Sequence, residues 1–217
     1  ASLKRASAIY LAAAALNAAV PFSVLPFLTR WLGPAEFGIA GNYLAMVNLA
    51  AVVAGLSVHG IISVVHFKQG ADAVAAYVFG SLRLLMFTGM PLLGALAMFG
   101  PWIEEVSAVP ARWVWTIGMV AAFQFVVAVG LVVFQTREEP VSYAVAQVGV
   151  ALGWGLMSLV FVGWSGMGWQ GRALAQLIAV AAVATAIVWR LRRMGLLKRS
   201  EQSATTASLL AFGLPMV

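Results

Sequence analysis

The sequence predicts an all-α membrane protein, a polytopic bundle of six transmembrane helices followed by the start of a seventh. Of its 217 residues, 63% are hydrophobic and only 9% are charged, whereas about 25% of the residues in soluble domains are charged. Uncharged runs of 24, 20 and 24 residues occupy positions 6–29, 84–103 and 113–136. Because about 20 apolar residues cross a bilayer as a helix, these runs are expected to be membrane spans.

The first three spans are expected before residue 100. The first covers about 7–29, and its two prolines are expected to bend its second half. The second is expected as a single helix over about 37–67, long enough to tilt strongly or to project beyond the bilayer. The third lies within 73–100. The next segment, 101–112, contains two prolines and two glutamates and is predicted to be a loop.

The last three spans are expected over about 113–135, 141–162 and 172–189. Pro140 stands where it can begin a helix without losing an internal hydrogen bond. The domain organisation therefore reads as a six-helix lobe over 1–190, a cytoplasmic linker over 191–208 and the start of a seventh helix over 209–217. That last run has nine residues, too few to span, so we expect a piece of a longer protein.

Basic residues predict the orientation, because cytoplasmic loops carry the excess of lysine and arginine. With a cytoplasmic N-terminus, nine Lys and Arg residues fall in cytoplasmic segments and three in external loops. Six tryptophans lie at the predicted ends of the spans, where an indole suits the membrane–water interface. The net charge of +6 is explained in this way without nucleic acid. We expect a multi-pass protein of a bacterial cytoplasmic (inner) membrane. The inside cations are Lys4, Arg5, Lys68, Arg137, Arg190, Arg192, Arg193, Lys198 and Arg199, and the outside ones are Arg30, Arg112 and Arg172.

No arrangement of residues indicates catalysis, so the protein is not predicted to be an enzyme. The chain has no cysteine, which excludes thiol chemistry and thiolate metal sites, and the glutamate pairs are expected in solvated loops. His59 and His66 lie seven residues apart on the expected second helix, but without a carboxylate or thiol they are a weak metal signal. No metal or other cofactor is predicted. His59 is a candidate for a proton-linked role, the plainer alternative being a polar helix contact.

Arg83 is the one charge within the expected third span. If that span begins near Ala73, Arg83 lies about 15 Å along the helix, near the middle of the membrane, where an arginine needs a watery cavity or a partner. If the membrane begins at Leu84, seventeen residues remain to Gly100, and Arg83 snorkels to the cytoplasmic surface. The sequence leaves both placements open.

Neutral polar side chains recur along the expected spans. Tyr143, Gln147, Trp154 and Ser158 fall within a narrow arc of the fifth span. Such stripes line a hydrophilic cavity or make interhelical hydrogen bonds worth about 1 kcal/mol each. For any single residue we favour an interhelical hydrogen bond. For the set as a whole we favour a cavity. The candidate substrate path comprises Arg83, Arg30, Asn17, Asn42, Asn48, Gln124 and Gln147.

Glycine spacing points to close helix packing. Gly149 and Gly153 form a GxxxG within the fifth span, a spacing that lets two helices approach closely. No glycine-rich nucleotide loop is present. ATP-driven chemistry within this chain is therefore not predicted.

The link between the first two spans carries a family resemblance. After Asn17 and Pro21 in the first span, the pattern Leu-Pro-x-x-x-Arg-x-Leu-Gly-Pro-x-x-Phe-Gly follows. It resembles the start of the polysaccharide biosynthesis (oligosaccharide flippase) family, within the multidrug/oligosaccharidyl-lipid/polysaccharide exporter superfamily. The segments "GWQGRALA" and "FGLPMV" are similar too. The matched residues are Leu25, Pro26, Arg30, Leu32, Gly33, Pro34, Phe37 and Gly38.

The resemblance implies two six-helix lobes about a central cavity, of which this chain is the MATE-like N-terminal lobe and a C-terminal lobe is missing. It implies that the protein, surrounded by membrane lipids, moves an undecaprenyl-pyrophosphate-linked oligosaccharide across the membrane. The coupling ion would be H⁺ or Na⁺. Arg83 is then the candidate for attracting the pyrophosphate, whereas a hairpin role is favoured for Arg30 over substrate contact. The alternatives are a cation-coupled multidrug exporter, a membrane-embedded transferase and a non-catalytic assembly subunit.

Overall fold

The computed structural model describes residues 3–56 and 58–197, and every regular element in these ranges is helical. Six helices are long and apolar enough to cross a membrane, which confirms the predicted helical membrane bundle. Residues 198–217, with the end of the expected linker and the seventh helix, lie outside the described part. The spans are α1 (Leu3–Trp31), α2 (Pro34–Gly55), α4 (Ala71–Met98), α6 (Ala111–Thr136), α7 (Pro140–Ser158) continued by the π-helical η2 (Leu159–Trp164), and α8 (Gly168–Arg193).

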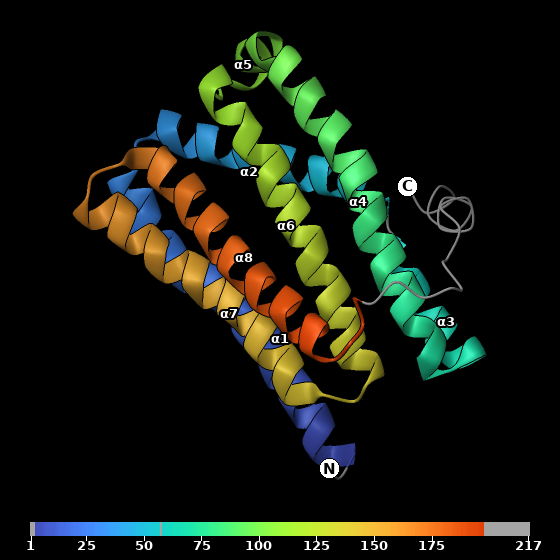
Figure 1. Ribbon diagram of the computed structural model, residues 1–217. Coiled ribbons are helices and arrows are strands. Elements are labelled where there is room, and N and C mark those ends of the chain that lie inside the picture. Colours follow the sequence, from blue (N-terminus) through green and yellow to red (C-terminus); the bar gives the residue numbers. More distant parts are fainter. Residues whose placement is uncertain (1–2, 57, 198–217) are drawn as a thin grey trace.

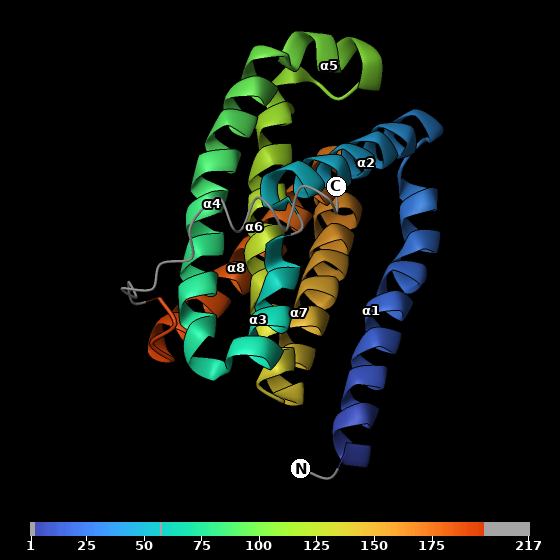
Figure 2. The same ribbon diagram turned by 90° about the vertical axis from the view of Figure 1, so that its right-hand side faces the viewer.

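Helix α6 is the centre of the bundle (Figure 1). It packs against α2, α4, α7 and α8 and is the most buried of the six spans. Helix α1 is the least buried and packs mainly along α7 and η2. Turning the molecule shows α1 and α4 on opposite sides, with α2 crossing the bundle between them (Figure 2). Polar groups on α1 and α4 therefore do not face one another.

The two ends of the bundle differ in charge. The start of α1, the turn between α6 and α7 and the last turn of α8 lie at one end, which we call the basic end (Figure 1). It carries Lys4, Arg137, Arg190 and Arg193. The α1–α2 link and α5 (Gly100–Ser107) lie at the opposite end. The grouping of these loops at two ends agrees with the predicted topology. Which side of the membrane each end faces stays a prediction.

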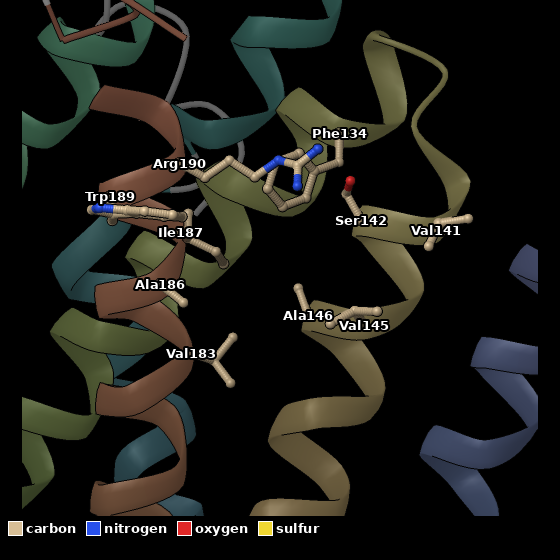
Figure 3. Close-up of a pocket in the computed structure, with 10 residues that line it drawn as sticks. All are labelled: Phe134, Val141, Ser142, Val145, Ala146, Val183, Ala186, Ile187, Trp189 and Arg190. Carbon is tan, nitrogen blue, oxygen red and sulfur yellow. The ribbon is translucent and has the colours of Figure 1, made fainter. Parts of the chain in front are cut away.

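An ion pair joins α7 and α8 at the basic end. Glu139 accepts a hydrogen bond from Arg190 at 2.7 Å and one from Ser142 at 2.9 Å, and Arg137 lies 3.6 Å away. Figure 3 shows Arg190 reaching from α8 toward Phe134 and Ser142 above an apolar pocket of about 300 Å³. Glu139 lies in the turn before α7, where it was expected, and its half-buried carboxylate ties two spans together.

Two predicted elements are wrong. The second span is not one helix over 37–67, because α2 ends at Gly55 and is followed by a short 3₁₀ turn, η1 (Val58–Gly60), and by α3 (Ile61–Gln69). Segment 101–112 is not entirely a loop, since α5 occupies most of it. Pro101 stands in the first turn of α5, where a proline loses no helical hydrogen bond.

Glycines set the contact between α7 and α8, as the GxxxG spacing predicted. A Cβ atom at Gly153 would lie 3.2 Å from the Cβ of Ala179, and one at Gly149 would lie 3.6 Å from the side chain of Val183. Association of helices in lipid depends on such close van der Waals packing.

We expect Gly153→Val to destabilise the bundle by about 1–3 kcal/mol, because the added atoms must push α8 away from α7. The matched control is Gly94→Val in α4, where a Cβ would meet no atom within 4 Å. Titration with sodium dodecyl sulfate in mixed micelles measures the difference. Equal midpoints for the two variants would contradict the packing role of Gly153.

Candidate functional site

The second span is interrupted by a backbone turn rather than by a proline. Leu56 caps α2 with φ 44° and ψ 33°, in the left-handed region, and its N–H donates to the Val52 carbonyl at 2.9 Å. A non-glycine residue pays on the order of 1 kcal/mol to adopt this conformation. Strained backbone of this kind is concentrated at functional sites, so the interruption is a candidate functional site.

The interruption lies near the middle of the bundle's length. A side chain at Gly55 would overlap the ring of Phe125, which stands at the centre of α6. From α4, the Thr88 hydroxyl donates to the Ala54 carbonyl at 2.7 Å, with the Leu84 carbonyl 3.1 Å away. Helix ends leave carbonyl groups without intrahelical donors, and in a membrane such groups must find donors within the protein. Thr88 fills that need.

A cavity of about 240 Å³ opens beside this interruption. His59 and Gln124 are its polar lining residues, and the rest of the lining is apolar. The imidazole stands edge-on to Phe125 with ring centres 6.2 Å apart, and its Nδ1 atom has no hydrogen-bond partner among the described residues. An apolar pocket with a few polar groups is typical of ligand sites. We call it the break pocket; its apolar members are Ala51, Val52, Gly55, Phe125 and Ala128.

The break also separates the two histidines. They were predicted to project from one helical face, but His59 lies in η1 and His66 lies in α3. His66 instead lines a different pocket, which includes Arg137 and Glu138 near the basic end. No group of three or more His, Cys, Asp or Glu side chains suited to a metal occurs within residues 3–56 and 58–197.

Asn17 and Gln147 belong to α1 and α7, two helices that pack against each other. Asn17 is half-buried on the face of α1 that also buries Ala13 and Val24, and the Gln147 Oε1 atom is buried without a partner among the described residues. Nearer the basic end, Tyr10 and Tyr143 pack edge to face with ring centres 5.0 Å apart. The polar stripe predicted on the fifth span is therefore turned toward α1.

The remaining candidates other than Arg83 are dispersed. Asn42 donates to the Ser107 carbonyl at 2.9 Å and so joins α2 to α5. Asn48 is exposed on α2, and Arg30 is exposed in the last turn of α1. Thr88 was not among the sequence-predicted site residues, because a threonine within an apolar helix gives no sign that it serves a carbonyl of another helix.

Arg83 lies on α4, away from the break pocket. Helix α4 runs unbroken through Arg83, as the mid-membrane placement requires. With a span over Ala73–Met98, Arg83 lies about 15 Å from its start and about 22 Å from its end. The side chain is exposed, and its guanidinium carbon lies 5.6 Å from the centre of the Phe87 ring. No carboxylate of the described residues forms an ion pair with it.

Comparisons with known proteins identify two relatives, both from Haemophilus influenzae. One, described as an uncharacterized membrane protein, is 30% identical over 152 residues, which cover 68% of this chain and 34% of the relative. The other, named as protein 1 of the Lsg locus, is 24% identical over 222 residues, which cover 97% of this chain and 51% of the relative. The chain thus spans about a third to a half of the length of these relatives. No protein-family model and no solved structure matches.

We expect Thr88→Val to lower stability by about 1–3 kcal/mol, since it removes a donor from a buried carbonyl at the break. The matched control is Thr185→Val in α8, whose exposed hydroxyl bonds the Ala181 carbonyl within its own helix, so that its loss leaves the helical backbone paired. Unfolding in mixed micelles compares the two. A larger loss for the control would contradict the role of Thr88.

Proposed function

We propose that this chain is a lobe of a transporter that moves a lipid-linked oligosaccharide across a bacterial cytoplasmic membrane. The observation that carries the proposal is Arg83, an exposed cation in the middle of α4 with no ion-pair partner among the described residues. In the mid-membrane placement, an arginine is expensive unless it faces a water-filled cavity, another protein surface or an anion. A pathway for a phosphorylated substrate supplies the water and the anion together.

The chemistry of the proposed substrate fits this position. A sugar on a pyrophosphate needs a polar and cationic path, whereas its polyprenyl tail can stay in lipid. A guanidinium binds phosphate oxygens through two parallel hydrogen bonds, and unlike an amine it stays charged under all relevant conditions. Arg83 would attract the pyrophosphate, and neutral amides such as the exposed Asn48 would contact the sugars.

The surroundings of Arg83 support a second lobe. Met86, Phe87 and Met90 beside it are 64%, 60% and 68% exposed, so this face of α4 is free to meet lipid or another part of a longer protein. Relatives two to three times the length of the aligned segment contain such a part. In the proposed arrangement the face would close against a C-terminal lobe, and the chain would be the MATE-like N-terminal lobe.

The break pocket supports coupling to an ion. Transporters place substrate and ion sites at discontinuous helices near the midplane, and His59 lines such a break. Histidine is the side chain that titrates near neutrality, so a proton is the ion that this pocket favours. The same pocket is mostly apolar, which favours a proton-coupled exporter of apolar compounds as the second candidate function.

We expect Arg83→Ala in the full-length protein to lower surface glycan at least tenfold at unchanged protein level in the membrane, because the pyrophosphate loses its cation. Quantitative glycan labelling on cells that depend on the protein measures the effect. Arg112→Ala, which removes an exposed cation at the first turn of α6, is the control. Wild-type glycan with Arg83→Ala would exclude the assignment, and altered drug resistance with normal glycan would favour the exporter.

His59 gives a separate test. We expect His59→Gln to abolish the acceleration of transport by an imposed proton gradient in proteoliposomes, since glutamine keeps a polar group but cannot titrate. His66→Gln, outside the break pocket, is expected to keep the acceleration. An undiminished gradient response in His59→Gln would rule out a proton-linked role for this residue.

A further inference from the structure

A second polar site lies between α1, α7 and α8, toward the end opposite the basic end. A small cavity there is lined by Val20, Val24 and Leu28 of α1 and by three polar side chains. Trp154 and Ser158 stand one turn apart at the end of α7, directly before the π-helical η2, and Arg172 stands in the second turn of α8. We call these three residues the outer polar cluster.

All members of the outer polar cluster can donate hydrogen bonds, yet they lack acceptors. The Ser158 side chain is 1% exposed, and neither its hydroxyl nor the buried Trp154 Nε1 atom has a partner among the described residues. The Arg172 guanidinium carbon lies 5.3 Å from the centre of the Trp154 ring. An indole and a guanidinium can only donate, so the cluster presents donors that converge on one cavity.

The positive charge of Arg172 is also unbalanced within the described residues. No carboxylate there forms an ion pair with it. A carboxylate at the same end, Glu36, lies against Gly168, one turn earlier on α8. There it offsets the partial positive charge of the helix N-terminus, but it forms no ion pair with Arg172. A water molecule would satisfy the hydroxyl and the indole but would not neutralise the guanidinium, whereas an anion satisfies all three groups.

The size and depth of the cavity identify the anion. It offers about 20 Å³, enough for one oxygen-sized atom, so the remainder of the ligand must lie at the rim, where Pro21 is exposed. Arg172 follows Gly168 by four residues, or about 6 Å along α8, which places it near the boundary between hydrocarbon and head groups. Lipid phosphates are the anionic oxygens concentrated at that depth.

We propose that Trp154, Ser158 and Arg172 bind the phosphate group of a membrane lipid, with one anionic oxygen in the cavity and the ester at the rim. The bound lipid would hold the lightly packed α1 against α7 and α8. The widened backbone turn of a π-helix is frequent at functional sites, and η2 begins immediately after Ser158. This site is separate from Arg83, because α1 and α4 lie on opposite sides of the bundle (Figure 2).

Native mass spectrometry of the full-length protein in detergent tests the site by titration with phosphatidylglycerol, with diacylglycerol of the same tails, with inorganic phosphate and with chloride. We expect saturable binding of phosphatidylglycerol, none of diacylglycerol and much weaker binding of the free ions. Arg172→Gln should weaken phosphatidylglycerol binding at least tenfold, and Arg172→Lys less, because it keeps the charge but loses the planar fork. Arg112→Gln, an exposed cation at the same end, should bind as the wild type does.

If Arg172→Gln binds phosphatidylglycerol within twofold of the wild-type affinity, the proposal is overturned. It is also overturned if the wild type binds phosphatidylglycerol and diacylglycerol equally well. Free phosphate or chloride binding as tightly as the lipid would overturn the lipid assignment. If Arg172→Gln does not fold, Ser158→Ala decides, with a several-fold loss expected and an unchanged affinity contradicting the site. The measurement needs no transport, so its failure and that of the flippase proposal are distinguishable.

Discussion

In hydrocarbon, an interrupted helix leaves carbonyl groups that water cannot reach, and the second span of this protein is interrupted at the middle of the bundle. The structure meets this constraint from two sides. Leu56 turns its N–H back onto α2, and Thr88 donates to the Ala54 carbonyl from α4. Gly55 lets the turn press against Phe125 of α6. The break pocket lies beside these contacts and shares Val52, Gly55 and Phe125 with them.

The rest of the bundle is held by close packing more than by polar contacts. Lipid tails are as apolar as leucine side chains, so helices gain from approaching closely rather than from leaving water. Gly149 and Gly153 let α7 pack onto α8, and a few hydrogen bonds join α2 to α4, α5 and α6. Among these, Tyr43 and Thr116 join α2 to α6 at 3.0 Å. The Glu139–Arg190 ion pair stands at the basic end, where water is available.

The sequence predicted one substrate path lined by polar residues of several spans. In the structure these residues are distributed over separate sides of the bundle. His59 and Gln124 line the break pocket, Asn17 and Gln147 belong to the packed helices α1 and α7, and Arg83 is exposed on α4. A moving substrate would not contact all of them within this lobe. The proposed tasks are separated accordingly, with ion coupling at the break, substrate attraction at α4 and lipid attachment beside α1.

The sequence by itself determined the class of protein, six spans and the charge difference between the two ends. Whether a segment spans the membrane and on which side a loop lies depend on the hydropathy and charge of that segment in water or lipid. These features can therefore be predicted without knowing which helices are neighbours. The start of α7 at Pro140 and the close packing at Gly153 are equally local. Only the tertiary structure decided where the second span breaks, because neither a proline nor a Lys, Arg, Asp or Glu residue marks the interruption. The placement of His59 and Gln124 in one cavity and the unpartnered donors around Arg172 likewise depend on helices distant in sequence, which local patterns do not record.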